Sequence, residues 1–178
     1  MRPATILPFV AFLATIPAAN WMIGNVGTTC IPSGPCLIPV GFGLMAPSGV
    51  LMIGLALVLR DMVQRESGAY TALAAIAAGT ILSYFVADPS IVLASVVAFA
   101  LAELLNQLVY TPLYRRRLIL AVTLSSVVGT VADSALFLWI AFGSLDYVAG
   151  QIVGKLWAVG AAILFMWWRY GRRQPAQP

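Results

Sequence analysis

Long apolar stretches are the feature that most limits how this chain can fold. Six of them occur along the 178 residues, and Pro, Gly or charged residues close each one. A helix of about 20 residues spans the hydrocarbon core of a bilayer, and each stretch is close to that length. The expected spans are residues 5–23, 41–59, 69–86, 90–110, 118–142 and 148–168. The sequence therefore predicts an all-α, polytopic membrane protein with six transmembrane helices.

The composition argues against a soluble domain. Hydrophobic residues make up 61% of the chain and charged residues 9%, whereas soluble domains carry about 25% charged residues. Residues 1–178 are thus expected to form a single transmembrane domain, with a short cytoplasmic tail at 169–178. Arg2 and the small residues near the end of the first stretch are typical of a cleavable signal peptide. That stretch continues through Ile23, which favours a retained helix.

The connections between the stretches are short and rich in turn-forming residues. The longest, GNVGTTCIPSGPCLIPV at 24–40, is expected to be an irregular loop because of its Pro and Gly. It contains Cys30 and Cys36, which either form a disulfide in an oxidising compartment or remain free small side chains. Asp88–Pro89 is expected to form a tight turn, and the fourth span is expected to stop at Pro112. Such connections place consecutive spans antiparallel in a compact bundle.

Basic residues indicate the orientation, because Lys and Arg are retained on the cytoplasmic side of a membrane. Nine of the ten precede the first span or follow the second, fourth and sixth spans. They are Arg2, Arg60, Arg65, Arg115, Arg116, Arg117, Arg169, Arg172 and Arg173. The pattern predicts that both termini are cytoplasmic. We interpret the basic clusters as topology determinants, and no nucleic-acid partner is expected.

Polar side chains lie inside three of the predicted spans. They are costly there unless they face a partner, a cavity or a pathway. Helical spacing places them on one polar or small face of each helix. They are Glu103, Asn106 and Gln107 on the fourth span, Asp133 with Phe137 on the fifth, and Gln151 with Lys155 on the sixth. The three faces are suited to a shared cavity.

Two interpretations of this polar set are open. Asp133 and Lys155 could form an ion pair that only neutralises both charges, while Glu103 is protonated and hydrogen-bonded. We favour a substrate pocket, because two carboxyls, one ammonium and three carboxamides exceed what one neutralised pair requires. Asn20, in the first span, is expected to contribute as well.

Catalysis and metal binding find little support in the sequence. The chain has no His and only two Cys, so it cannot form a Ser-His-Asp or Cys-His arrangement and lacks the usual zinc ligands. Ser134 beside Asp133 is a weak candidate nucleophile. A phosphate-binding loop of the G-x-x-x-x-G-K-[ST] type does not occur. We expect no enzyme activity, no cofactor and no metal, and ATP drive would require another protein.

Two adjoining segments resemble a known family. ASVVAFALAELLNQLVYTPLYRRR at 94–117 is followed by SSVVGTVADSALFLWIAF at 125–142. Together they resemble the central signature of the queuosine precursor transporters, also described as vitamin uptake transporters. Shorter similarities are AAN at 18–20, RDMVQRESG at 60–68 and GKLW at 154–157.

The resemblance implies a six-helix protein of the bacterial inner membrane that imports deazaguanine precursors of queuosine, a modified nucleoside of tRNA. It also draws attention to Asp61 and Arg65, which either take part in gating or coupling or form a surface pair four residues apart. Asn106 departs from the acidic residue of related chains, while Glu103 stands near an amide position. The substrate contacts that the resemblance implies are Asn20, Glu103, Asn106, Asp133, Ser134 and Lys155.

The chemistry of a deazaguanine fits these side chains. Its ring N–H and exocyclic amine can donate together to one carboxylate, either Asp133 or Glu103. Its ring carbonyl can accept a hydrogen bond from Lys155 or from one of the amides. A flat heterocycle also stacks on an aromatic ring, and Phe137 is the candidate because it shares the face of Asp133.

The sequence thus predicts a small uptake carrier that binds a purine-like base near the bilayer midplane and exposes it to each side in turn. The expected partners are this substrate and the lipid bilayer, and a homodimer is left open. Glu103 and Asp133 could also couple transport to protons. The alternative is the membrane substrate-binding subunit of a vitamin importer that a partner ATPase drives.

Overall fold

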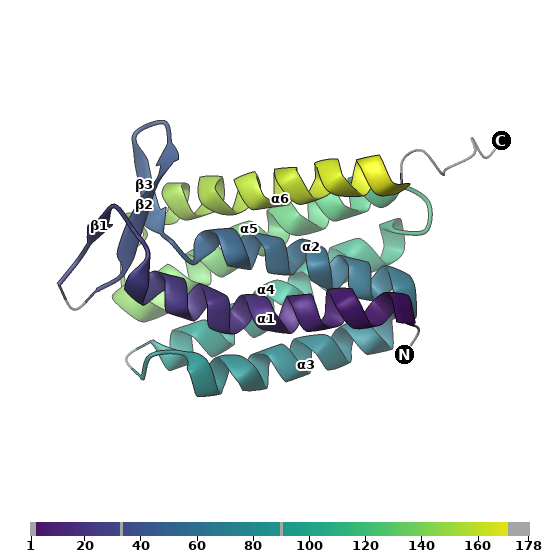
Figure 1. The fold of residues 1–178 in the computed structure, drawn as a ribbon, viewed down its shortest axis with the longest axis horizontal. Coiled ribbons are helices and arrows are strands. Elements are labelled where there is room, and N and C mark those ends of the chain that lie inside the picture. The colour runs from purple at the N-terminus through teal and green to yellow at the C-terminus, as the bar shows by residue number, and fades with distance from the viewer. Residues whose placement is uncertain (1–2, 33, 90, 171–178) are drawn as a thin grey trace.

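The computed structural model describes residues 3–32, 34–89 and 91–170 as a helical bundle with a small antiparallel sheet at one end (Figure 1). Arg2, Arg172 and Arg173 lie outside the described residues. The helices are α1 (Pro3–Asn25), α2 (Val50–Ser67), α3 (Ala69–Val86), α4 (Val92–Leu113), α5 (Leu118–Phe142) and α6 (Val148–Tyr170). The strands are β1 (Thr29–Cys30), β2 (Cys36–Gly41) and β3 (Leu44–Pro47), in the order β1-β2-β3.

Five of the described helices, α1, α3, α4, α5 and α6, are long and apolar enough to cross a membrane. The chain is therefore a multi-pass membrane protein. The exception is α2, which carries Arg60, Asp61, Arg65 and Glu66 within its 18 residues. This helix packs against α1, α3, α5 and α6, and such neighbours shield charged side chains from lipid. Whether α2 forms the sixth span stays a prediction.

The segment before α2 corrects two predictions. A span at 41–59 and an irregular loop before it are both wrong, because residues 36–47 form β2 and β3 and the helix begins only at Val50. Gly41, Phe42 and Gly43 have φ angles of 99°, 54° and 72°, so three left-handed residues in a row reverse the chain between the strands. A short apolar run does not distinguish a strand from a buried helix, which is why the sequence misleads here.

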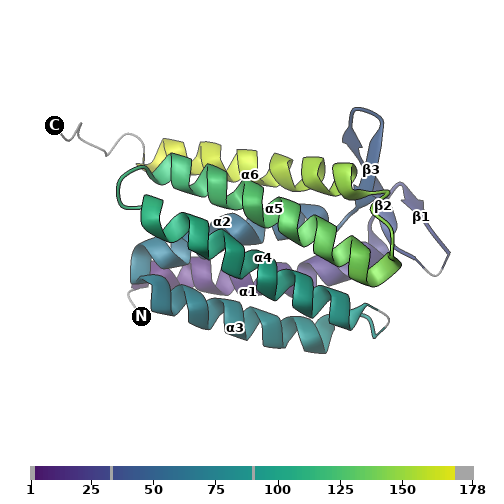
Figure 2. The same cartoon turned by 180° about the vertical axis from the view of Figure 1, so that it is seen from behind.

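The later start of α2 also changes the role of two basic residues. Arg60 and Arg65 were predicted to follow a span. Instead they lie within α2, and Arg60 is fully buried. The exposed basic residues of the α4–α5 connection, Arg115, Arg116 and Arg117, lie far from the sheet (Figure 2). The start of α1 and the end of α6 lie there too (Figure 1). We call this the basic end, and the positive-inside rule predicts that it faces the cytoplasm.

The sheet is fixed to the bundle at the opposite end, called the sheet end below. A disulfide joins Cys30 to Cys36, which settles the alternative left open by the sequence. Trp157 of α6 donates its indole N–H to the carbonyl of Val40 at 2.8 Å. Ser48 donates its hydroxyl to the carbonyl of Met22 at 2.7 Å and thereby connects the end of β3 to α1.

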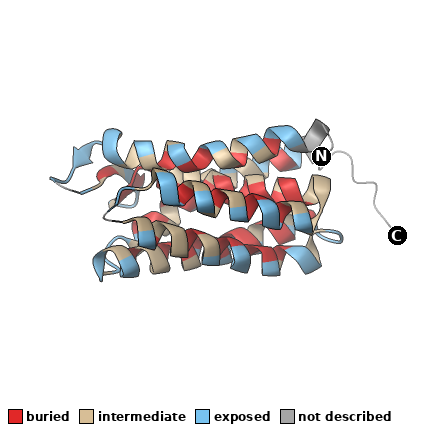
Figure 3. Cartoon of the chain, turned by 90° about the horizontal axis from the view of Figure 1, so that it is seen from below, coloured by how far each residue is buried: buried red, intermediate tan, exposed pale blue. Residues whose placement is uncertain are grey.

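The bundle is apolar outside and partly polar inside. Large exposed side chains such as Leu108, Trp139 and Trp167 face outward, as lipid contact requires. Buried residues follow the inward sides of the helices (Figure 3). They include apolar clusters around Leu57 and Phe12, but also charged and amide side chains. The interior polar groups define the candidate site.

Candidate functional site

The centre of the candidate site is the ammonium group of Lys155 on α6. It donates to Asp133 Oδ2, to Ser134 Oγ at 2.8 Å and to Gln151 Oε1 at 3.2 Å. Lys155 is 1% exposed and Asp133 is 8% exposed. An ammonium has three hydrogens to donate, so this environment satisfies it fully. The ion pair raised as an alternative in the sequence therefore exists.

Local helix geometry brings these groups together. Gln151 and Lys155 lie four residues apart and so share one face of α6, while Asp133 and Ser134 are adjacent on α5. The backbone of α6 approaches α2 closely at Gly54, where an added Cβ would lie 2.5 Å from the carbonyl oxygen of Lys155. A glycine is needed at this crossing because any larger residue would displace Lys155.

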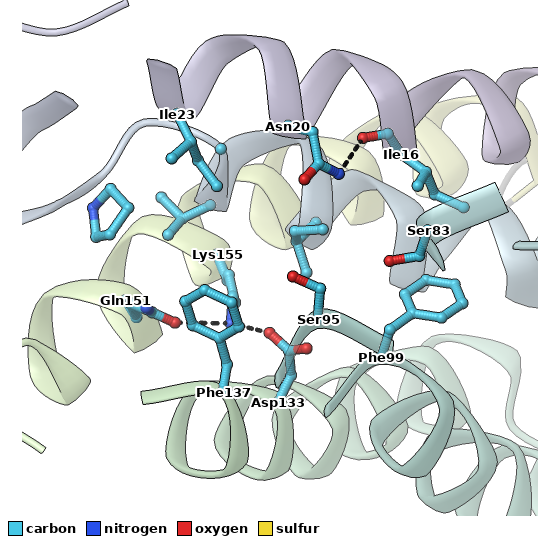
Figure 4. A pocket seen from close by; sticks show the side chains of 14 residues that line it. Ile16, Asn20, Ile23, Ser83, Ser95, Phe99, Asp133, Phe137, Gln151 and Lys155 are labelled. Carbon is cyan, nitrogen blue, oxygen red and sulfur yellow. Dashed lines mark hydrogen bonds and ion pairs between the residues drawn. The ribbon is translucent and has the colours of Figure 1, made fainter. Parts of the chain in front are cut away.

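The ion pair lines a cavity of about 60 Å³, called the outer pocket below (Figure 4). Figure 4 shows Asn20 of α1 and Phe137 of α5 around it, with the amide of Gln151 beside Lys155. Asn20 donates its amide N–H to the carbonyl of Ile16 at 3.0 Å. Ser83, Ser95 and Phe99 complete the polar and aromatic lining from α3 and α4. All six helices thus contribute to one small, mixed surface.

A larger cavity of about 820 Å³, the vestibule, continues from the outer pocket. Asn20, Ile23, Pro47 and Phe137 line both spaces. The vestibule extends to the turn between β1 and β2 and to Asp88 after α3, both at the sheet end. Its volume lies within the range of about 300–1,000 Å³ typical of small-molecule sites. The outer pocket is therefore reached from the end opposite the basic one.

A second charged group, the inner cluster, consists of Arg60, Asp61 and Glu103. Arg60 Nη1 lies 3.1 Å from Asp61 Oδ1, and Arg60 Nε donates to Glu103 Oε2 at 3.0 Å. Gln64 accepts from Arg60 Nη1 at 3.3 Å, and Ser125 donates to Asp61 Oδ2 at 3.1 Å. The three charged side chains are at most 2% exposed. This cluster joins α2, α4 and α5 away from the vestibule.

The structure gathers some of the residues selected from the sequence. Asn20, Asp133, Phe137, Gln151 and Lys155 line the outer pocket. Ser134 adjoins it through its hydrogen bond to Lys155.

The three residues selected on α4, Glu103, Asn106 and Gln107, do not line the outer pocket. Glu103 belongs to the inner cluster, and Gln107 donates to the carbonyl of Ala69 at 3.3 Å. Asn106 is completely buried against α5, where its Cβ lies 3.2 Å from the position of a Cβ on Gly129. The shared face expected on this helix is real, but it packs between helices.

The interpretation of Asp61 and Arg65 as a surface pair is wrong. Asp61 is fully buried in the inner cluster and Arg65 is half-buried. Arg60 was not expected to be a functional residue, because its position after a predicted span favoured a role as a topology determinant. The signal was available: Arg60, Asp61 and Gln64 lie at positions i, i+1 and i+4, which is one polar helix face.

Residues 83–171, half of the chain, match the model of a family described as "Putative vitamin uptake transporter". The chain belongs to this family. The resemblance noted on residues 94–117 and 125–142 is thereby confirmed at the level of the family. No curated protein and no solved structure matches the chain.

Membership in this uptake transporter family agrees with an interior that is partly polar and an exterior that is apolar. The matched segment contains Glu103, Asp133 and Lys155, whereas Asn20 and Arg60 lie in the half of the chain before it. The helices of both halves meet at the outer pocket. A member of this family is expected to move a solute across the membrane.

Proposed function

We propose that this transporter imports a deazaguanine precursor of queuosine across the bacterial inner membrane, and that the outer pocket binds the base. The observation that supports this most directly is the combination of Asp133, Lys155 and Phe137 on one cavity wall. A carboxylate, an ammonium and an aromatic ring match the amine edge, the carbonyl and the flat face of such a base. The resemblance to queuosine precursor transporters supplies the substrate class.

Each polar group of the pocket has a proposed partner on the base. Asp133 accepts from the ring N–H and the exocyclic amine, which is a charge-assisted pair of hydrogen bonds. The ring carbonyl accepts from Lys155 or from the amide of Asn20 or Gln151. Phe137 stacks on the ring.

The size of the cavities suggests where the base sits. The outer pocket, at about 60 Å³, accommodates a few water molecules, which is too little for a bicyclic base. We therefore place the base at the junction of the outer pocket and the vestibule, where Asn20 and Phe137 line both spaces. From there its amine edge can reach Asp133, and a closing motion of the helices would bring it deeper.

The vestibule suggests a direction of transport. It opens at the sheet end, whereas the exposed Arg115, Arg116 and Arg117 are at the other end. If the basic end is cytoplasmic, as the positive-inside rule predicts, the structure is open to the outside and ready to load substrate. Release on the other side then requires the helices around the inner cluster to separate, as in alternating access.

The first test is accumulation of the cyano-deazaguanine precursor by cells that can neither make nor import it. We expect uptake with the wild-type protein and loss of uptake with Asp133→Asn. Asp146→Asn makes the same chemical change on an exposed residue outside the pocket, so it should transport normally. Absence of uptake by the wild type, despite confirmed membrane expression, would contradict the proposed substrate.

A second measurement addresses the energy source. The purified chain in liposomes should exchange the base between inside and outside without any other protein. Uptake in cells that is lost in liposomes and restored by a co-purified ATPase would favour the substrate-binding subunit of an ATP-driven importer instead.

A further inference from the structure

The inner cluster is a buried charged group that the proposed base site does not use. Gly54 of α2 packs against the backbone of Lys155, and Arg60 lies six residues further along the same helix. At a rise of about 1.5 Å per residue, this places Arg60 roughly 9 Å closer to the basic end than the outer pocket. The inner cluster therefore lies on the side where substrate has to leave.

The charges of the inner cluster do not balance. Two carboxylates, Asp61 and Glu103, share the single guanidinium of Arg60. Both carboxylates are sealed from solvent, and an uncompensated buried charge is strongly unfavourable. The cluster becomes neutral when one of its two carboxyl groups binds a proton. The pair of Asp133 and Lys155 has no such excess.

Within the described residues, the ion pairs that Asp61 and Glu103 make are both with Arg60. Arg65, one turn further along α2, acts electrostatically on Tyr110 of α4, whose ring lies under Arg60 at 5.8 Å. From α5, Ser125 donates to Asp61, and the negative charge of Asp133 acts on Glu103. Lys155 of α6 is held by its pocket partners. The residues of α1 and α3 include no Asp, Glu, Lys or Arg.

Buried polar atoms without a hydrogen-bond partner surround the inner cluster. Among the described residues, Arg60 Nη2, the Tyr110 hydroxyl and both amide atoms of Asn106 have no hydrogen-bond partner. The same holds for the hydroxyls of Ser126 and Thr130, which lie on α5 between Ser125 and Asp133. In folded proteins, ordered water molecules typically form hydrogen bonds with buried polar groups of this kind. They form a polar line from the outer pocket to the inner cluster.

We propose that the inner cluster is the proton-binding site of this transporter, and that one proton bound by Asp61 or Glu103 moves inward with each molecule of substrate. The proton enters from the vestibule, binds a carboxylate oxygen and displaces one of the ion pairs of Arg60. It leaves towards the basic end when Arg60 pairs with that carboxylate again. The coupling, though not the proton site itself, rests on the proposed uptake function.

Infrared spectroscopy tests the proton site without any substrate. Purified wild-type protein in lipid should show the carbonyl stretch of a buried protonated carboxyl group, and the band should titrate with pH. Asp61→Asn and Glu103→Gln each leave one carboxylate facing Arg60, so each should lose the band. Asp146→Asn, on the surface, should keep it. A wild-type protein without a titrating band, or a band that persists in both variants, would overturn the proposal; the wild-type result counts even if a variant does not fold.

Transport of the base in liposomes tests the coupling. An acidic exterior should increase wild-type accumulation several-fold over equal pH, whereas Asp61→Asn should still exchange base but show no increase with the gradient. Wild-type exchange that ignores the gradient would overturn the coupling. If the wild type exchanges no base at all while the infrared band is present, the proposed substrate fails and the proton site stands.

Discussion

Replacing Lys155 with methionine tests how much of the bundle depends on the charged centre of the outer pocket. The change removes the donor shared by Asp133, Ser134 and Gln151. Both charged side chains are nearly inaccessible to solvent, so water from the outer pocket replaces the ammonium only in part. Breaking a buried ion pair by removing one partner costs about 3–5 kcal/mol. At about 2–4 °C per kcal/mol for a chain of this size, the thermal midpoint should fall by roughly 6–20 °C.

A double-mutant cycle isolates the pair from the rest of the packing. Asp133→Asn removes the carboxylate charge, and the double variant Lys155→Met with Asp133→Asn leaves no unpaired charge. We expect the double variant to be more stable than the sum of the single changes predicts, with a coupling of about 0.5–3 kcal/mol. The assay is thermal unfolding of the purified proteins in one detergent, with the exposed Asp146→Asn as control.

The outcome separates a structural pair from a transport site. The double variant should recover stability but not uptake, because a base site needs both the carboxylate and the ammonium. A single Lys155→Met variant that unfolds within about 2 °C of the wild type would refute the energetic reasoning, since it predicts a shift several times larger. A double variant that transports normally would refute the role of the pair in binding.

Three further predictions follow from other contacts. Gly54→Ala places a Cβ 2.5 Å from the carbonyl oxygen of Lys155 and should destabilise the protein by about 1–3 kcal/mol. Gly160→Ala is the control, because the Cβ added there has no neighbour within 4 Å among the described residues and should not destabilise the protein. Thermal unfolding of the two variants tests this difference. Phe137→Ala should raise the half-saturating base concentration about 2- to 13-fold by loss of stacking worth about 0.5–1.5 kcal/mol, and Trp139→Ala on the exposed face should leave it unchanged. Reducing agent should lower the thermal midpoint of the wild type, because the Cys30–Cys36 disulfide closes a short loop and so stabilises the folded state by about 2 kcal/mol. The double variant Cys30→Ser with Cys36→Ser should show no change in thermal midpoint when reducing agent is added.

The sequence predicts those helices well whose apolar runs are long and uninterrupted. The expected spans 69–86 and 118–142 coincide with α3 and α5, and 148–168 differs from α6 only at its end. The span at 41–59 failed because its first residues form β2 and β3. Nothing in the short segment GFGLMAP at 41–47 reveals that a hairpin will form there, since the pairing depends on Gly41 and Gly43 adopting positive φ.

Helical periodicity shows which residues share a face of one helix. It does not show which residues of another helix pack against that face, because this depends on tertiary structure. The spacing on α4 correctly places Glu103 and Asn106 on one buried face, but it cannot identify the partner across the interface. That partner, Arg60, lies 43 residues away on α2, in a helix whose bounds the sequence analysis misjudged. The pairing of Asp133 with Lys155 was accessible because both lie in well-predicted helices.

The two charged centres are connected mechanically as well as by their electrostatics. Ser125, which donates to Asp61, and Asp133, which accepts from Lys155, lie eight residues apart on α5. That separation is roughly 12 Å along one continuous helix, so a movement of α5 towards or away from α6 changes the outer pocket and the inner cluster together. A base that takes over Asp133 from Lys155 would loosen α5 from α6 and disturb the bond between Ser125 and Asp61. The inner cluster could then exchange its proton in the same step in which the pocket fills.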